Sequence, residues 1–424
     1  MISYARLMIT IGLMIGALAG AFEPKEGAIL QTDRKDGRHV SSRGVAQALL
    51  EEMRPRCAFR PEELRAEDFP AWRERLRQAM KEVMKHPEKA ATQPPKMIKS
   101  VQREGYRVEK WEAYPFAQAA VPFLALVPEN VSEHAPAPAI LCMPGSGQTK
   151  EMLAGETTQD LSGPAVEQPH DNAMALHYVR EGWIAIVADN AGTGEEGDKQ
   201  AKGRYYNDDE NLARILLEMD WSWLGYTSYA DQCILNWMKE QPMIRRDRIV
   251  LSGFSLGTEP MMALGVLNPD VYAFVYNDFL CRTLERLQTL TQPNGRGGRP
   301  APNNIRHLIP GFLREFDFPD IVAALAPRPV LCTEGGLDRD FLMIQKAYQM
   351  AGAPEQFTYH HQPKYADAGK RWQGDTLPHG LDRDTFFRLA NVDPRNHYFK
   401  KELALPWLRK LLAPESSKEK QDCH

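Results

Sequence analysis

The chain has 424 residues, of which 43% are hydrophobic and 25% are charged, and its formal net charge is −4. This composition is typical of a globular protein with a large core, and the length favours one α/β domain with appendages over three small domains. The nearly balanced charge points neither to a nucleic-acid partner nor to an anionic membrane surface.

The N-terminus carries a targeting pattern. Arg6 precedes an apolar run over 7–21 that ends in Ala19-Gly20-Ala21. A positive start, an apolar core and this ending predict a secretory signal over 1–21, cut before Phe22, and hence a secreted or periplasmic protein. The run is short for a membrane span, although an uncleaved anchor is the alternative. We expect no stable membrane association after cleavage.

Residues 22–97 are expected to form a largely helical extension. Residues 22–42 are polar and read as extended chain, whereas 43–86 carry helical patterns. One helical face is apolar and should pack on the main domain. It comprises Trp72, Leu76, Ala79, Met80 and Val83. Residues 87–97 are rich in proline and lysine and read as a linker.

Residues 98–412 are expected to form a single α/β domain, followed by a polar tail over 413–424. The stretches 106–114 and 121–127 read as an antiparallel strand pair at a sheet edge. Six further strands then alternate with helices, which predicts a mostly parallel, doubly wound sheet with helices on both faces. These strands are 138–143, 183–188, 248–252, 272–277, 329–333 and 356–360. The helices are near 171–181, 228–240, 259–267, 341–351 and 400–412.

Four insertions interrupt this alternation, near 148–170, 192–227, 283–320 and 361–395. The first three leave the carboxyl ends of strands, where ligands bind in open α/β sheets. The second contains the aromatic residues Tyr205, Tyr206, Trp221, Trp223 and Tyr226. These side chains are candidates for a sugar-stacking wall, and packing on the core is the alternative.

The most informative motif is Gly253-Phe254-Ser255-Leu256-Gly257, a G-x-S-x-G between an expected buried strand and an expected helix. In this position the serine sits on a strained turn that exposes its hydroxyl at the sheet edge. Ser255 is therefore the candidate nucleophile.

The loop after strand 138–143 supplies a candidate oxyanion hole. It reads Pro144-Gly145-Ser146-Gly147-Gln148 and should expose its amides. We expect the N–H groups of Ser146 and Leu256 to stabilise a developing oxyanion.

Asp338 is the candidate acid, because it follows the buried strand 329–333 on a glycine turn. Asp278, at the end of strand 272–277, is the main rival. Glu334 and Asp340 lie close to Asp338 in the chain. For these two residues a solvated surface position is the alternative to a role in the site.

His397 is the candidate general base, since it lies in the loop before the closing helix. His379, within the insertion 361–395, competes with it. His360 and His361 lie on or just past a strand and are expected to pack or face solvent. We expect no metal, because the eleven histidines show no metal-binding spacing. The six cysteines form no framework, although one disulfide remains possible.

These motifs resemble those of serine esterases of the α/β-hydrolase superfamily, in particular the bacterial group of acetyl xylan esterases and dienelactone-hydrolase-like proteins. The matching stretches span about 100–412. They are Gly145-Ser146-Gly147, the run 189–194 (Asp-Asn-Ala-Gly-Thr-Gly), Gly253–Gly257, the run 326–329 leading to Asp338, and Asn396-His397-Tyr398-Phe399. Two features depart from the pattern. Dienelactone hydrolases use a cysteine nucleophile, and relatives often have His-Gly where this chain has Pro144-Gly145.

The resemblance implies a cofactor-independent Ser-His-Asp esterase that hydrolyses short acyl esters, most simply acetyl groups on carbohydrate. A peptidase on the same scaffold and a non-catalytic binding protein are the alternatives. The substrate, the acyl length and the oligomeric state do not follow from the sequence.

Overall fold

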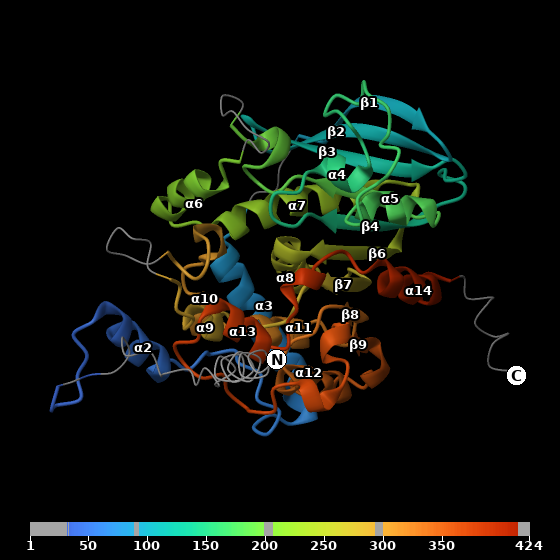
Figure 1. The fold of residues 1–424 in the computed structure, drawn as a ribbon. Helices are drawn as coiled ribbons and strands as arrows, with labels where there is room; N and C mark the ends of the chain where they lie inside the picture. The colour runs from blue at the N-terminus through green and yellow to red at the C-terminus, as the bar shows by residue number, and fades with distance from the viewer. Residues whose placement is uncertain (1–31, 33, 89–92, 199–206, 293–299, 414–424) are drawn as a thin grey trace, which may run out of the picture.

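A computed structural model describes residues 32, 34–88, 93–198, 207–292 and 300–413 (Figure 1). The expected signal over 1–21, its cleavage point, Tyr205, Tyr206 and the tail from 414 lie outside the described residues.

Within the described residues, nine strands form one mixed sheet in the order β1-β2-β3-β5-β4-β6-β7-β8-β9. The pairs β1–β2, β2–β3 and β3–β5 are antiparallel. The remaining pairs, from β5–β4 to β8–β9, are parallel. The strands are β1 Lys96–Arg103, β2 Tyr106–Phe116, β3 Ala119–Pro128, β4 Ala137–Met143, β5 Ile184–Ala188, β6 Ile244–Phe254, β7 Ala273–Asn277, β8 Val330–Cys332 and β9 Phe357–Tyr359. The expected α/β sheet is confirmed, and β1 extends it by an edge strand that begins where a linker was expected.

Successive side chains of a strand point to opposite faces of the sheet, so a strand that is apolar throughout needs cover on both faces. Helices provide that cover here. In β4, Leu141 joins one core cluster while Ile140 and Cys142 join the other. The first cluster includes side chains of α3 (Phe69–Met84), α7 (Trp223–Glu240), α8 (Thr258–Leu267), α11 (Phe318–Ala324) and α12 (Asp338–Met350). The second includes side chains of α4 (Lys150–Ala154), α5 (Met174–Arg180) and α14 (Lys401–Leu412).

The N-terminal extension packs on the main domain through α3. All five side chains of the expected apolar face are buried, so this prediction is confirmed. The indole Nε1 of Trp72 donates to the Cys57 carbonyl at 3.0 Å, and Arg73 Nε donates to the Ala324 carbonyl at 3.1 Å. The helix α2 (Ser42–Glu52) precedes α3 in the extension.

Short helices lie in all four segments expected as insertions: α4 in the first, α6 (Asp209–Glu218) in the second, α9 (Thr283–Leu287) and α10 (Phe312–Glu315) in the third, and α13 (Arg383–Leu389) in the fourth. The three described aromatic side chains of the expected sugar-stacking wall, Trp221, Trp223 and Tyr226, pack on the protein instead. Trp223 is fully buried and donates to the Ala191 carbonyl at 2.9 Å, while Trp221 and Tyr226 pack on each other. The helix α7 begins at Trp223, five residues earlier than expected, because Ser222 caps it by accepting from Gly225 N.

Cys142 and Cys332 lie in core strands as expected, and the five described cysteines are all free: Cys57, Cys142, Cys233, Cys281 and Cys332. No helix among the described residues combines the length and apolar character needed to cross a bilayer.

Candidate active site

The turn that holds Ser255 has a backbone conformation that few side chains adopt. β6 ends at Phe254, and the φ of Ser255 is 52°, in the left-handed region. A Cβ on Gly253 would lie 2.5 Å from the Gly257 carbonyl oxygen, and one on Gly257 would collide with the Met143 carbonyl. Both glycines are therefore needed for the close approach of strand, turn and helix. This geometry is that of a nucleophile elbow.

Ser255 lines a cavity of about 450 Å³, together with Ser146, Leu256 and His397. Two of the expected insertions form much of its wall. The insertion 283–320 contributes Thr289, Thr291, Asn304, Arg306 and His307, and the insertion 361–395 contributes Arg383, Phe386, Phe387, Val392 and Asp393. The cavity thus brings together residues that lie more than 200 positions apart.

His397 is held by a buried carboxylate. Its Nδ1 lies 2.5 Å from Oε2 of Glu334, whose side chain is fully buried. The imidazole also stacks on the Phe254 ring, with centroids 4.7 Å apart. With Nδ1 facing Glu334, Nε2 is the nitrogen left to exchange a proton with a reacting group.

Glu334 is fixed by three further donors on its other oxygen, Oε1. Asn277 Nδ2 donates at 3.1 Å and the Tyr398 amide at 3.2 Å, while Lys400 Nζ lies at 3.3 Å. A buried carboxylate requires such partners, because an unpaired one is strongly destabilising. The polar contacts therefore hold Glu334 in one orientation beside the imidazole.

Charges around His397 tune its proton affinity. Burial alone would lower the pKa of His397, but the hydrogen bond to Glu334 and the charges of Asp278 and Glu334 outweigh it and raise that pKa. Burial raises the pKa of Asp278 to about 6, against the opposing charge of His397. Ligand atoms of Asp278, Glu334 and His397 lie within 4.8 Å of one another, so this is the described group that could hold a cation.

The expectation for the acid is wrong: Asp338 does not contact His397. Its Oδ1 lies 2.8 Å from His361 Nε2 and accepts from Arg371 Nη1 at 2.7 Å. The reason is local geometry. Glu334 stands at the carboxyl end of β8, whereas Gly335 turns the chain away with a φ of 81°, and Asp338 begins α12. Glu334 is buried rather than solvated and takes the position beside the His397 imidazole that was expected of Asp338.

The remaining acid and base candidates bind different groups. His379 Nδ1 contacts Gln47 Nε2 at 2.9 Å and does not line the cavity. Asp278 lines the cavity beside His397, but its Oδ1 accepts from the Phe279 amide at 2.8 Å. Asp340 is buried and accepts from Arg282 Nε at 2.9 Å. His361, expected to pack or face solvent, packs edge-on against Phe341 and Tyr359 and also contacts Asp338.

The expected oxyanion loop borders the same cavity. Gly145 N donates to Gln148 Oε1 at 2.9 Å, and Asn190 Nδ2 donates to the Pro144 carbonyl at 2.8 Å, so the loop is braced from both sides. No acceptor within the described residues faces the Ser146 amide. The Leu256 amide is at the start of a helical segment, where N–H groups lack helical partners. Both residues line the cavity with Ser255, and their amides stay candidates for the oxyanion hole.

A buried ion cluster that sequence reasoning missed supports this loop. Lys150 is fully buried, and its Nζ lies 2.8 Å from Asp189, Glu151 and Glu195 alike. Its backbone amide also donates to Asp189 Oδ1 at 2.7 Å. These negative charges raise the pKa of Lys150 against the opposing effect of burial. The only sequence signal was the run 189–194, whose Asp189 and Asn190 both brace the loop.

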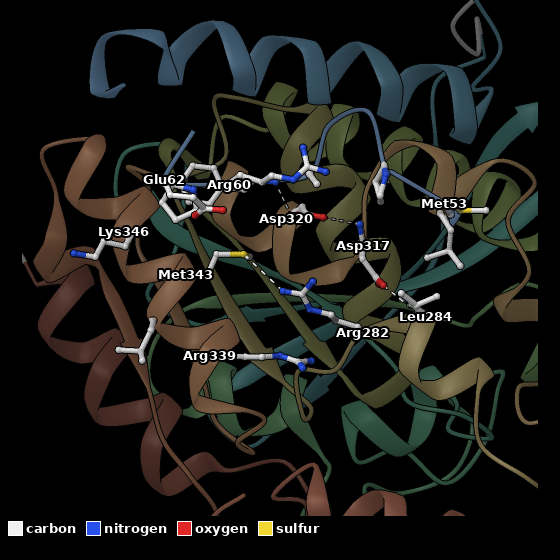
Figure 2. A pocket seen from close by; sticks show the side chains of 16 residues that line it. Met53, Arg60, Glu62, Arg282, Leu284, Asp317, Asp320, Arg339, Met343 and Lys346 are labelled. Atoms are coloured by element: carbon white, nitrogen blue, oxygen red, sulfur yellow. Dashed lines mark hydrogen bonds between the residues drawn. The ribbon is translucent and has the colours of Figure 1, made fainter. Parts of the chain in front are cut away.

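A second cavity, of about 520 Å³, lies between the N-terminal extension and α12 (Figure 2). Two of its charged groups are bound within the protein: Arg282 pairs with the buried Asp340, and Asp320 accepts from the Phe59 amide at 2.8 Å. Although this cavity is somewhat larger, it contains neither Ser255 nor His397, and we place the active site in the other one.

A nucleophile elbow at the edge of a mostly parallel sheet, with an imidazole–carboxylate pair in the same cavity, defines an α/β-hydrolase. The chain belongs to the abhydrolase family, whose family model matches residues 21–410.

A solved structure of a protein with half of its aligned residues identical supports this assignment. A Bacteroides fragilis protein described as a "putative acetyl xylan esterase" is 50% identical, with a TM-score of 0.86 over 93% of this chain and all of that one. The methylesterase BT1017 is 17% identical, with a TM-score of 0.48 over 84% of this chain and 70% of that one. A glucuronoyl esterase from Teredinibacter turnerae is 15% identical, with a TM-score of 0.46 over 74% of this chain and 85% of that one. No curated protein matches the sequence.

Proposed function

We propose that this protein is a serine hydrolase that cleaves carboxylic esters, with Ser255 as nucleophile, His397 as general base and Glu334 as the acid that orients it. The observation that carries the proposal is the shared cavity: the Ser255 elbow and the His397–Glu334 pair line it together. Glu334 replaces Asp338 in this role because it is Glu334 that contacts the imidazole.

In the proposed reaction, Ser255 Oγ attacks the ester carbonyl carbon while its proton passes to Nε2 of His397. The amides of Ser146 and Leu256 stabilise the oxyanion that forms. The bond to the alcohol then breaks, and the alcohol leaves with the proton from His397. Water attacks the acyl-Ser255 ester in the same way, which releases the carboxylic acid and regenerates the serine.

The proposed substrates are short acyl esters, most simply acetyl groups, on carbohydrate. The 50% identical protein from Bacteroides fragilis, named for acetyl xylan, supports this class by likeness. Aromatic side chains suited to stacking on sugar rings also line the cavity, although they differ from those expected: Phe279, Phe386 and Phe387. The proposed location is outside the cytoplasm, on the pattern of residues 1–21.

The test is to compare kcat/KM on acetylated xylo-oligosaccharides, long-chain esters and peptide amides, for wild type and for Ser255→Ala. The expected result is the highest value on the acetylated oligosaccharides and a loss of several orders of magnitude in the variant. A preference for long acyl chains would indicate a lipase instead, and cleavage of amides but not esters would indicate a peptidase.

A further inference from the structure

Three arginines line the cavity that contains Ser255, and they differ in what they contact. Arg306 is engaged: its guanidinium pairs with Asp209, and its Nη2 donates to Ser146 Oγ at 2.8 Å. Arg306 therefore serves the protein's own structure beside the expected oxyanion loop. The other two arginines, Arg286 on α9 and Arg383 at the start of α13, have no such partners.

Arg286 is half-buried, yet its guanidinium makes no hydrogen bond and has no carboxylate oxygen within 4.0 Å among the described residues. From beyond that distance its charge acts to lower the pKa of Asp278, against the larger opposing effect of burial. Arg383 is exposed and lies over the Phe387 ring, 5.4 Å from its centroid. That contact uses the face of the guanidinium and leaves its N–H edge free.

The carboxylates of the same cavity are engaged elsewhere. Glu334 contacts His397, and Glu259 Oε1 lies 2.6 Å from His307 Nδ1. Asp278 and Asp393 accept from backbone amides of their own segments, those of Phe279 and Arg395. Within the described residues, Arg286 and Arg383 therefore have no carboxylate in direct contact. The N–H groups of both guanidinium groups remain available to a ligand.

We propose that Arg286 and Arg383 bind a carboxylate carried by the substrate, so that the preferred substrate is an acidic ester. This inference rests on the proposed esterase function and narrows its substrate class. A guanidinium holds a carboxylate through two parallel N–H···O bonds, which gives orientation as well as affinity. The carboxylate can belong to an acidic sugar unit on the alcohol side of the ester or to the far end of a dicarboxylic acyl group.

Two matched substrate pairs test the proposal and separate these sources. The first pair is acetylated xylo-oligosaccharides with and without a glucuronic acid branch. The second is 4-nitrophenyl hemisuccinate and 4-nitrophenyl butyrate, which have similar acyl lengths. The readout is kcat/KM at low and high salt for wild type, Arg286→Gln, Arg286→Lys and Arg383→Gln. The control is Arg314→Gln, because Arg314 is exposed on α10 and does not line the cavity.

We expect wild type to prefer the acidic member of one pair by about 10-fold to 100-fold, the range for a charge-assisted hydrogen-bonded contact. Arg286→Gln should remove most of that preference, Arg286→Lys should keep part of it, and Arg314→Gln should keep all of it. High salt should reduce it, since screening weakens an exposed ion pair. A preference for the acidic member of the first pair would support an acidic sugar. A preference for the acidic member of the second pair would support a dicarboxylic acyl group.

Equal rates within both pairs in wild type would overturn the proposal while leaving the esterase function intact. Equal losses on acidic and neutral esters in Arg286→Gln would also overturn it, because they would indicate a purely structural arginine. If wild type hydrolyses neither the acidic nor the neutral esters, the proposed esterase function itself fails.

Discussion

His397 Nδ1 and Glu334 Oε2 lie 2.5 Å apart, and the carboxylate that makes this contact is fully buried. An imidazole held in this way has a fixed tautomer and a fixed ring orientation, with Nε2 left for proton transfer. The contact identifies Glu334 as the acid of the proposed catalytic site.

Glu334→Gln should lower kcat by about 10²-fold to 10⁴-fold, because a neutral amide neither stabilises the imidazolium nor holds the required tautomer. The matched control is Asp338→Asn, which alters a carboxylate that contacts His361 and Arg371. It should change kcat only a few-fold. Steady-state kinetics on an aryl acetate, with thermal unfolding of both variants, provides the check. A larger loss in Asp338→Asn would restore Asp338 as the acid.

The rate should fall on the acidic side of the pH profile at a pH above the ordinary histidine value of about 6.5. The sign follows from the raised pKa of His397: the imidazole must be neutral to accept the Ser255 proton, and a raised pKa keeps it protonated to higher pH. Asp278→Asn should move this limb to lower pH, because it removes a charge that raises the pKa of His397. A limb that stays in place would show that Asp278 does not act on the imidazole.

Lys150→Met should destabilise the fold by about 3–5 kcal/mol, because it leaves the buried carboxylate of Asp189 beside Glu151 and Glu195 without their shared cation. Urea unfolding measures this change. The matched control is Lys401→Met, whose side chain is 41% exposed and whose Asp171 partner lies at 3.4 Å. It should stay within about 0.5 kcal/mol of wild type. Equal effects would mean that the cluster around Lys150 is not a structural anchor.

Gly257→Ala should abolish activity or prevent folding, since the added methyl group would meet the Met143 carbonyl at the elbow. Gly182→Ala is the comparison: a Cβ there meets nothing within 4 Å, although the φ of 85° adds backbone strain. It should cost stability but leave kcat unchanged. Circular dichroism and an esterase assay on both variants distinguish the outcomes. An active, stable Gly257→Ala enzyme would contradict the close packing of the elbow.

The sequence predicted the sheet and the elbow well, because both depend on local patterns. Buried parallel strands are continuous apolar runs, and G-x-S-x-G places Ser255 by its neighbours alone. The acid could not be predicted in the same way. Glu334 and Asp338 both follow β8 closely, and only the direction in which Gly335 turns the chain decides which of them reaches His397. Two partners of Lys150, Asp189 and Glu195, likewise come from segments distant in the chain.

The most direct test of the proposed site is to label the intact protein with a fluorophosphonate and to locate the modified residue by peptide mapping. Ser255 should carry the label in wild type, labelling should slow strongly in His397→Ala and Glu334→Gln, and the Ser255→Ala protein should remain unlabelled. Stoichiometric labelling of another serine, or unchanged labelling in Ser255→Ala, would contradict the assignment of Ser255 as the nucleophile.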